Sequence, residues 1–315
     1  MKKNGYKYLF GPVPSRRLGR SLGVDLVPHK VCTLNCVYCE CGKTTRMTTQ
    51  RDEYIPTKAV IDEIGRYLAD GPDLDYITFS GFGEPTLHSG IGKITGFIRD
   101  NYPGYNTALI TNSTMFPEPG VIDEILPIDV IMPSLDAATD AVFKKINRPA
   151  GSLRIGAIIE GLIALRERYK GEIWLEIFII SGLNDTEEEI AALGNAVRRI
   201  RPDRVQINTM DRPGTEAWVA APTKEDLEHI VKRLDYPGTE IIAKFKDRSD
   251  SRQYKGDIEA AIIELIRRRP CTLSDLSSSL GLNTLEINKY IAALLSDKKI
   301  KSERLDRGVF YQYME

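Results

Sequence analysis

The sequence has little of several features that mark specialised classes of protein. It holds only five cysteines and three histidines in 315 residues, and 43 basic residues nearly balance 44 acidic ones. Five cysteines in a chain of this length exclude a disulfide-stapled scaffold, which needs more cysteines in a shorter chain. The net charge of -1 excludes a protein that coats polyanions over its whole surface, although it leaves room for a local basic patch.

Long apolar runs are also missing. The longest, such as 177–180, have the length of a strand, far below the roughly 18 residues that a membrane span needs. The first residues are not followed by the apolar stretch and small-residue cleavage site of a signal peptide. We therefore expect no membrane association and a cytoplasmic location, where the cysteines are thiols or metal ligands.

An alternation of strand-like and helix-like segments begins after the first 20 residues. Strand-like runs occur at 22–27, 76–79, 108–111, 130–133, 173–180, 204–208 and 240–245. Helical periodicity covers 57–69, 91–100, 119–126, 139–147, 152–169, 186–200 and 223–234. The alternation predicts an α/β domain over residues 1–250, a partial (β/α)6-type barrel of parallel strands with its chemistry at their carboxyl ends. Residues 1–21, rich in Gly, Pro and Arg, are predicted to form an irregular arm.

Residues 255–315 have a different pattern, with three helical segments followed by two strand-like runs. This order predicts a C-terminal winged helix-turn-helix domain. Its charge is nearly balanced, with 10 basic and 9 acidic residues over 253–315, which is weak support for DNA binding. Binding of RNA or DNA, binding of a peptide or protein, and simple coverage of the barrel all stay open for this domain.

Three of the five cysteines lie within eight positions. Cys32, Cys36 and Cys39 have the spacing C-x-x-x-C-x-x-C, and three thiolates in one short loop suit an iron–sulfur cluster. A fourth iron without a protein thiol would be open to a ligand, as in catalytic metal centres. The alternative is a structural zinc loop with Cys41 as a cramped fourth ligand. The spacing favours the iron–sulfur interpretation.

The cysteine loop, with Tyr38 just before its third cysteine, resembles that of the radical SAM superfamily. The resemblance implies a [4Fe–4S] cluster on Cys32, Cys36 and Cys39, with S-adenosylmethionine (SAM) bound to the fourth iron. It further implies reductive cleavage of SAM to a 5′-deoxyadenosyl radical that abstracts a substrate hydrogen, and an electron donor such as flavodoxin or ferredoxin. Tyr38 would lie near the adenine of SAM.

A second motif, residues 80–85, reads Ser-Gly-Phe-Gly-Glu-Pro and resembles the Gly-Gly-Glu-Pro segment of the same family. Phe82 stands where that segment has its first glycine. The resemblance implies SAM contacts at Gly81, Gly83, Glu84 and Pro85, with Glu84 accepting a hydrogen bond from the methionyl ammonium. By the same resemblance, further SAM contacts are expected at strand ends: Asn112, Ser134, Asp136, Glu176 and Asn184. Helix capping for the first three, and a surface carboxylate for Glu176, are the alternatives.

The substrate is the least determined part of the prediction. Candidate substrate residues are Arg16, Arg17, Arg20, Gln206, Asn208 and Arg212. Residues 11–25 resemble a branch of uncharacterised iron–sulfur oxidoreductases grouped loosely with wyosine tRNA-modification enzymes, which suggests a tRNA nucleoside as substrate. A peptide or a metabolite is the alternative, and an iron–sulfur sensor that regulates transcription through the winged helix is an alternative of another class. A second cluster is not expected, because only Cys41 and Cys271 remain.

Overall fold

The computed structural model describes residues 6–15, 17–210, 214–243, 258–282, 284–305 and 307–314. Its centre is an eight-stranded sheet with the strand order β1-β2-β5-β6-β7-β8-β9-β10. The strands are β1 (Leu9–Ser15), β2 (Gly19–Asp25), β5 (Tyr76–Ser80), β6 (Asn106–Thr111), β7 (Val130–Pro133), β8 (Glu172–Phe178), β9 (Arg204–Asn208) and β10 (Thr239–Ile241). All neighbours pair in parallel except β1 and β2. The predicted α/β class with a parallel sheet is confirmed.

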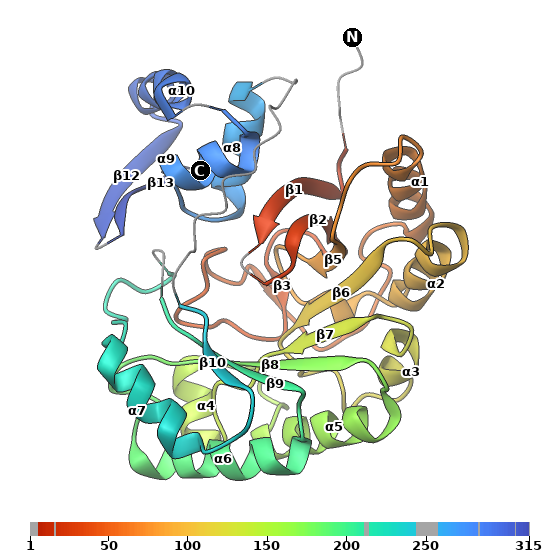
Figure 1. Ribbon diagram of the computed structural model, residues 1–315, viewed down its shortest axis with the longest axis vertical. Coiled ribbons are helices and arrows are strands. Elements are labelled where there is room, and N and C mark those ends of the chain that lie inside the picture. Colours follow the sequence, from red (N-terminus) through yellow and green to blue (C-terminus); the bar gives the residue numbers. More distant parts are fainter. Residues whose placement is uncertain are drawn as a thin grey trace.

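Helices follow the strands and lie around the outside of the sheet, along the right and lower sides of Figure 1. They are α1 (Thr57–Leu68), α2 (Ile91–Asn101), α3 (Val121–Ile125), α4 (Asp140–Ile146), α5 (Ile155–Arg168), α6 (Glu187–Ile200) and α7 (Lys224–Leu234), with a 3₁₀ turn, η1 (Pro85–Leu87). Strand residues of one parity, such as Ile77, Leu109 and Leu175, are buried in the main core with helix residues such as Ile94 and Leu193. This alternation gives the sheet one helix-covered face and one inner face.

The inner face is apolar near the amino ends of the strands and polar further along them. Leu18, from the turn between β1 and β2, packs there with Val130, Met132 and Trp174 in a separate cluster. The eight-stranded sheet and helices α1 to α7 are together called the half-barrel below. Because this turn lies at the amino ends of the parallel strands, Leu18 closes that end of the half-barrel. The other end, where the strands finish, is left to the loops that carry the predicted motifs.

The first strand departs from the sequence prediction. The prediction of an irregular arm over residues 1–21 is wrong for residues 9–15, which form β1 and pair antiparallel with β2. Pro12 and Pro14 obscured this strand, since proline lacks the N–H of a regular ladder. Proline is tolerated at the edge of a sheet and at irregularities, and the register of β1 shifts between Phe10 and Val13.

Residues 258–314, called the C-terminal unit below, have their own apolar core. They comprise α8 (Ile258–Arg268), β11 (Cys271–Thr272), α9 (Leu273–Leu280), α10 (Thr284–Ser296), β12 (Ile300–Leu305) and β13 (Gly308–Tyr313). The strands form a sheet with the order β11-β13-β12. The unit lies beside β1 and β2 (Figure 1). Helices and hairpin come in the expected order, and the identification as a winged helix stays a prediction.

In the described part of the chain, no helix is both long and apolar enough to span a membrane.

Candidate active site at the carboxyl ends of the strands

The cysteine loop follows β2 and is tied down on two sides by backbone hydrogen bonds. Cys32 ends the short strand β3 (Val31–Cys32), which pairs with β4 (Arg46–Met47). Val37 N donates to Ile146 O at 2.9 Å, and the Glu84 N–H donates to Val31 O at 3.2 Å. The loop is therefore held by the end of α4 and by the glycine-containing motif after β5. The structure brings the two predicted motifs together.

Each of the three thiols has a side-chain hydrogen-bond donor close to its sulfur. Asn112 Nδ2 lies 3.5 Å from Cys32 Sγ, Asn147 Nδ2 lies 3.4 Å from Cys36 Sγ, and Lys30 Nζ lies 3.0 Å from Cys39 Sγ. The Lys30 side chain is buried, which is rare for a lysine without a negatively charged partner. These donors stabilise negative charge on sulfur, as a thiolate ligand needs.

The pKa values of the thiols differ with their surroundings. The Cys41 thiol and the Lys30 ammonium act against burial and lower the pKa of Cys39 to about 5. Burial raises the pKa of Cys32 to about 11 and that of Cys36 well above its ordinary value. Burial lowers the pKa of Lys30, but the charge and hydrogen bond of Cys39, together with the charges of Cys32 and Cys41, raise it by more, so that the net change is upward. Cys39 is thus the thiol most readily available as a thiolate.

The donor set fits the cluster that the sequence predicts. Cys32, Cys36 and Cys39 form no disulfide and come from one loop. The charge of Cys39 raises the pKa of both Cys32 and Cys36, and that of Cys32 raises the pKa of Cys36, so the three thiols lie close together. Thiolates are the ligands that iron–sulfur clusters take. Within the described residues, no three His, Cys, Asp or Glu side chains are grouped so that they could hold a single metal ion.

The glycines of residues 80–85 are required by close approach of the backbone. A Cβ on Gly83 would lie 1.9 Å from Val31 O in the cysteine loop. Gly81 has φ +112°, and a Cβ there would lie 1.7 Å from Asp25 Oδ1. A side chain at either position would push this loop away from the cysteines, so the glycines allow the two motifs to share one site.

Glu84 is fully buried and accepts four hydrogen bonds. Its Oε1 accepts from Thr86 N at 3.0 Å, Thr86 Oγ1 at 2.5 Å and Thr111 Oγ1 at 2.7 Å. Its Oε2 accepts from Asn112 N at 2.8 Å. Burial raises the pKa of Glu84, while these bonds lower it. The carboxylate joins the end of β5 to the end of β6, so it fixes the loop whatever else it contacts.

Asp136 joins the cysteine loop to β8. Its carboxylate accepts from Tyr38 Oη at 2.5 Å, Asn147 Nδ2 at 2.7 Å and Phe178 N at 3.0 Å. The Tyr38 ring stacks on Phe178 with centroids 3.9 Å apart. Burial raises the pKa of Asp136 to about 6 against the effect of these bonds. The structure therefore gives Asp136 a bracing role that the capping alternative did not include.

Asn184, a predicted SAM contact, is held by hydrogen bonds within the protein. Its side chain has no exposed surface, and its amide bonds only within the protein: Oδ1 accepts from Ile180 N, and Nδ2 donates to Asp136 O and Phe178 O. These bonds connect the turn after β8 to Asp136.

Four predicted residues meet on the inner face. Arg17 Nη1 lies 2.5 Å from Glu176 Oε2 and 3.3 Å from Gln206 Oε1, and Asn208 Nδ2 lies 3.4 Å from the same glutamate oxygen. Glu176 thus points inward, and the surface alternative is excluded. Ser134 forms a parallel bridge with Glu176, which places this polar layer next to the loop after β7.

Arg20 is not brought to this site. It lies near the start of β2, at the opposite end from the cysteine loop, and its exposed Nη1 pairs with Asp73 Oδ2 at 3.0 Å. Two other predicted residues, Arg16 and Arg212, lie outside the described residues.

Sequence reasoning missed Lys30, Asn147 and Phe178 as neighbours of the cysteine loop. Lys30 precedes Cys32 by two positions, which could have suggested a partner for a thiolate. Asn147 and Phe178 lie more than 100 residues away in the chain, and no pattern in the sequence indicates their approach. The structure also places Cys41, which is outside the predicted set of cluster ligands, close enough to hydrogen-bond Cys39.

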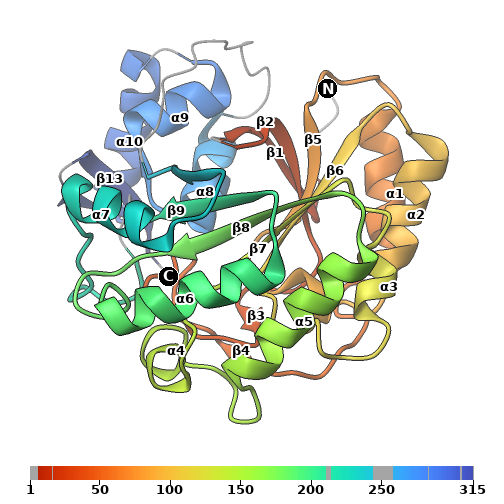
Figure 2. The same ribbon diagram turned by 60° about the horizontal axis from the view of Figure 1, so that its bottom comes forward.

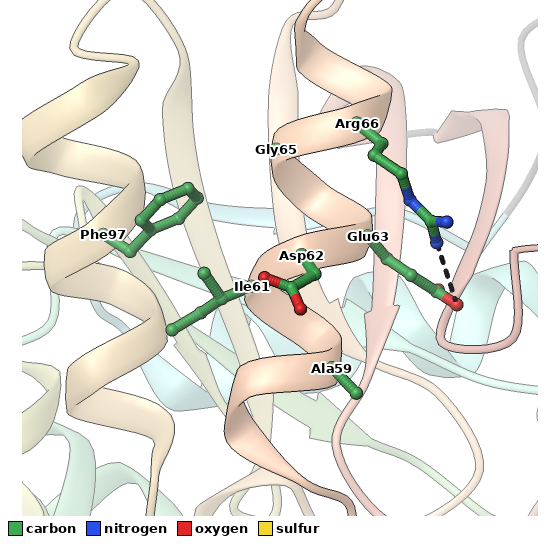
Figure 3. Close-up of a pocket in the computed structure, with 7 residues that line it drawn as sticks. All are labelled: Ala59, Ile61, Asp62, Glu63, Gly65, Arg66 and Phe97. Carbon is green, nitrogen blue, oxygen red and sulfur yellow. Dashed lines mark ion pairs between the residues drawn. The ribbon is translucent and has the colours of Figure 1, made fainter.

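A separate cavity of about 640 Å³ lies on the outer side of the molecule, between α1 and α2 (Figure 3). It is lined by Asp62, Glu63, Arg66 and Phe97 among others, and the Arg66–Glu63 ion pair spans 3.8 Å beside it. Figure 2, in which α5 and α6 lie in front, shows α1 and α2 at the right, with β5 and β6 between them and α8. This cavity has no contact with the cysteine loop and is not part of the site.

Known proteins resemble this chain in sequence and in fold. The sequence profile of the Radical SAM superfamily matches residues 26–194. The "UPF0026 protein" of Methanocaldococcus jannaschii is 32% identical over 313 residues, 96% of this chain and 94% of that protein. The "GTPase Obg" of Brachyspira hyodysenteriae is also 32% identical over 313 residues, and the match spans 97% of this chain but 45% of that protein.

More distant matches extend the comparison. The "S-adenosyl-L-methionine-dependent tRNA 4-demethylwyosine synthase" of Mus musculus is 22% identical over 257 residues, 73% of this chain and 33% of that enzyme. The crystal structure of a radical SAM methyltransferase from Sphaerobacter thermophilus matches with a TM-score of 0.53 and 18% identity, over 72% of this chain and 67% of that one. This last likeness concerns the fold of the half-barrel.

Proposed function

Because the chain belongs to the radical SAM superfamily, we propose that it is an enzyme that abstracts a hydrogen atom from an RNA nucleoside. The family uses a [4Fe–4S] cluster and SAM, which together supply a 5′-deoxyadenosyl radical when bound. The observation that carries the proposal is the meeting of the cysteine loop with residues 81–85 at the carboxyl ends of the strands.

The chain's own residues have separable tasks in this proposal. Cys32, Cys36 and Cys39 hold the cluster, and Asn112, Asn147 and Lys30 donate toward their sulfurs. Gly81, Gly83, Glu84 and Pro85 shape the wall that receives the methionyl part of SAM. Tyr38, Ser134 and Asp136 brace the opposite wall.

The substrate would enter over the polar layer of the inner face. Arg17, Gln206 and Asn208 offer donors and acceptors there, and hydrogen bonding to base edges and riboses requires both. The distant similarity to an enzyme named for tRNA modification supports an RNA substrate, and the C-terminal unit is the part proposed to bind the rest of the RNA. An electron donor such as flavodoxin or ferredoxin is required by the same chemistry.

The first test concerns the reaction. The protein is reconstituted anaerobically with iron and sulfide, then mixed with dithionite and SAM, and 5′-deoxyadenosine is measured by chromatography. We expect its formation only with the full cluster. A protein with four irons per chain that forms none would overturn the proposal, and zinc without labile sulfide would establish the structural zinc alternative.

The second test concerns the substrate. Unmodified transcript tRNA should accelerate 5′-deoxyadenosine formation over the rate without RNA, whereas a mixture of peptides of equal total mass should not. Stimulation by peptides alone would replace RNA with a peptide as substrate. Cluster-dependent binding to one DNA duplex, without SAM cleavage, would favour the transcription-regulator alternative.

A further inference from the structure

An arginine of the C-terminal unit reaches into the candidate active-site domain. Arg268 is the last residue of α8, and its side chain is only 13% exposed. Its Nη1 lies 2.5 Å from Oδ2 of Asp25, the last residue of β2. The two residues are separated by 243 positions, so this contact exists only through the docking of α8 on the sheet.

The guanidinium also lies close to two aromatic rings. Its central carbon is 3.8 Å from the ring centroid of Phe10 and 4.9 Å from that of Phe82. Cations over aromatic faces are attracted by the ring electrons, more strongly when both groups are withdrawn from water. Phe82 is the residue that stands in place of a glycine in the motif after β5. The departure from the family pattern therefore coincides with a contact to the C-terminal unit.

Asp25 connects the same arginine to the neighbouring glycine. Its carboxylate lies where a Cβ of Gly81 would be, and its side chain is 7% exposed. Burial raises the pKa of Asp25 in spite of Arg268. Among the described atoms, Asp25 Oδ1 and Arg268 Nε are buried without hydrogen-bond partners. Arg268 is thus the main counter-ion of the Asp25 carboxylate, which lies against Gly81.

We infer that Arg268 is a positioning residue that holds residues 80–85 in the conformation that binds SAM, so that docking of the C-terminal unit sets the affinity for SAM. The inference rests on the proposed function, because it takes residues 81–85 as the SAM wall. If α8 moves away, Phe82 loses its cation and Asp25 loses its counter-ion, and both changes fall on the same loop.

A consequence follows from the reciprocity of linked equilibria. A ligand of the C-terminal unit that favours the docked position must tighten SAM binding, and SAM must tighten the binding of that ligand by the same factor. In the proposed function, the ligand is the RNA substrate. The enzyme would then bind SAM most tightly when its substrate is present, which limits uncoupled radical formation.

The test compares Arg268→Met with the control Arg267→Met, both in cluster-loaded protein. Arg267 is the neighbouring arginine, and its side chain stacks on Tyr313 within the C-terminal unit. We measure hydrogen exchange of the amides of residues 80–84 without SAM, and the Kd for SAM by calorimetry. Arg268→Met should raise the exchange rates and weaken SAM binding about fivefold to tenfold. Arg267→Met should change neither.

Two further variants separate positioning from loss of fold. The double variant Asp25→Asn/Arg268→Met has no buried carboxylate left without a counter-ion. Its melting temperature should equal that of the wild type, whereas its Kd for SAM should still be raised. In a Phe82→Gly background, the effect of Arg268→Met on the Kd should shrink at least twofold, because the ring contact is gone.

The outcomes are distinguishable from those of the proposed function. Unchanged exchange of residues 80–84 in Arg268→Met overturns the inference, whether or not SAM binds. A wild-type protein with a full cluster that fails to bind SAM overturns the proposed function and, with it, the link to SAM affinity. Equal weakening in the wild-type and Phe82→Gly backgrounds contradicts transmission through Phe82.

Discussion

Arg17 and Glu176, 159 positions apart, meet inside the half-barrel with 2.5 Å between Nη1 and Oε2. The arginine comes from the turn that closes the amino end of the sheet, and the glutamate comes from β8. Their side chains are 16% and 14% exposed, so the pair is largely withdrawn from water. This ion pair separates the apolar cluster around Leu18 from the polar layer that is proposed to face the substrate.

Because removal of one partner leaves a largely buried charge, Arg17→Met and Glu176→Gln should each lower the free energy of unfolding by about 2 kcal/mol. The double variant should lose less free energy of unfolding than the two single variants together, and urea denaturation should give a coupling free energy of about 1 kcal/mol between the two residues. The exposed pair Arg20–Asp73 is the control, and its cycle should give a coupling of less than about 0.5 kcal/mol. Equal coupling in the two cycles would contradict the packing described here.

Cys36→Ala should lose the iron and labile sulfide of reconstituted protein, because only two of the three predicted ligands remain. Cys41→Ala should keep both, since Cys41 interacts with Cys39 without being a predicted ligand. Iron and sulfide analysis together with the visible absorption spectrum measures this difference. If Cys41→Ala lost the cluster and Cys36→Ala kept it, Cys41 would be a ligand in place of Cys36.

Gly83→Ala should destabilise the protein by about 1–3 kcal/mol, since its Cβ would lie 1.9 Å from Val31 O and force the two motifs apart. Gly96→Ala, inside α2, meets nothing within 4 Å and should be neutral or stabilising by up to about 1 kcal/mol. Thermal unfolding of the two variants compares them directly. If both substitutions had the same effect, the close approach at Gly83 would be unsupported.

His88 should make the stability depend on pH. Its ring is fully buried, Nε2 donates to Ile55 O at 2.7 Å, and Nδ1 accepts from Gly90 N at 3.0 Å. Burial lowers the pKa of His88, so the unfolded chain takes up a proton at a higher pH than the folded one. Stability should therefore fall as the pH drops below about 6.5, the pKa of an unperturbed histidine.

The measurement for His88 is the urea midpoint between pH 7.5 and 5.5. His88→Gln should flatten the loss at low pH. The matched control is His229→Gln, which changes an exposed histidine and should leave the slope as in the wild type. A wild-type slope in His88→Gln would show that other groups cause the pH dependence.

The sequence alone determined the order and type of most elements of the half-barrel. The predicted runs at 130–133 and 204–208 coincide with β7 and β9, because apolar runs of strand length between helical periods have few other interpretations. The cysteine spacing and residues 80–85 could be found for a similar reason: both motifs are local, and thiolate geometry and glycine freedom act over a few residues. The edge strand β1 could not be found, because its prolines resemble those of a loop.

Which side chains meet depends on packing between distant segments of the chain. The pairing of Arg17 with Glu176, the approach of Asn147 to Cys36 and the insertion of Arg268 beside Phe82 each join segments more than 100 positions apart. Such contacts depend on the curvature of the sheet and the docking of α8, which no local pattern encodes. The sequence thus identified the chemistry of the site, whereas packing decided which residues brace it and which unit of the chain can influence it.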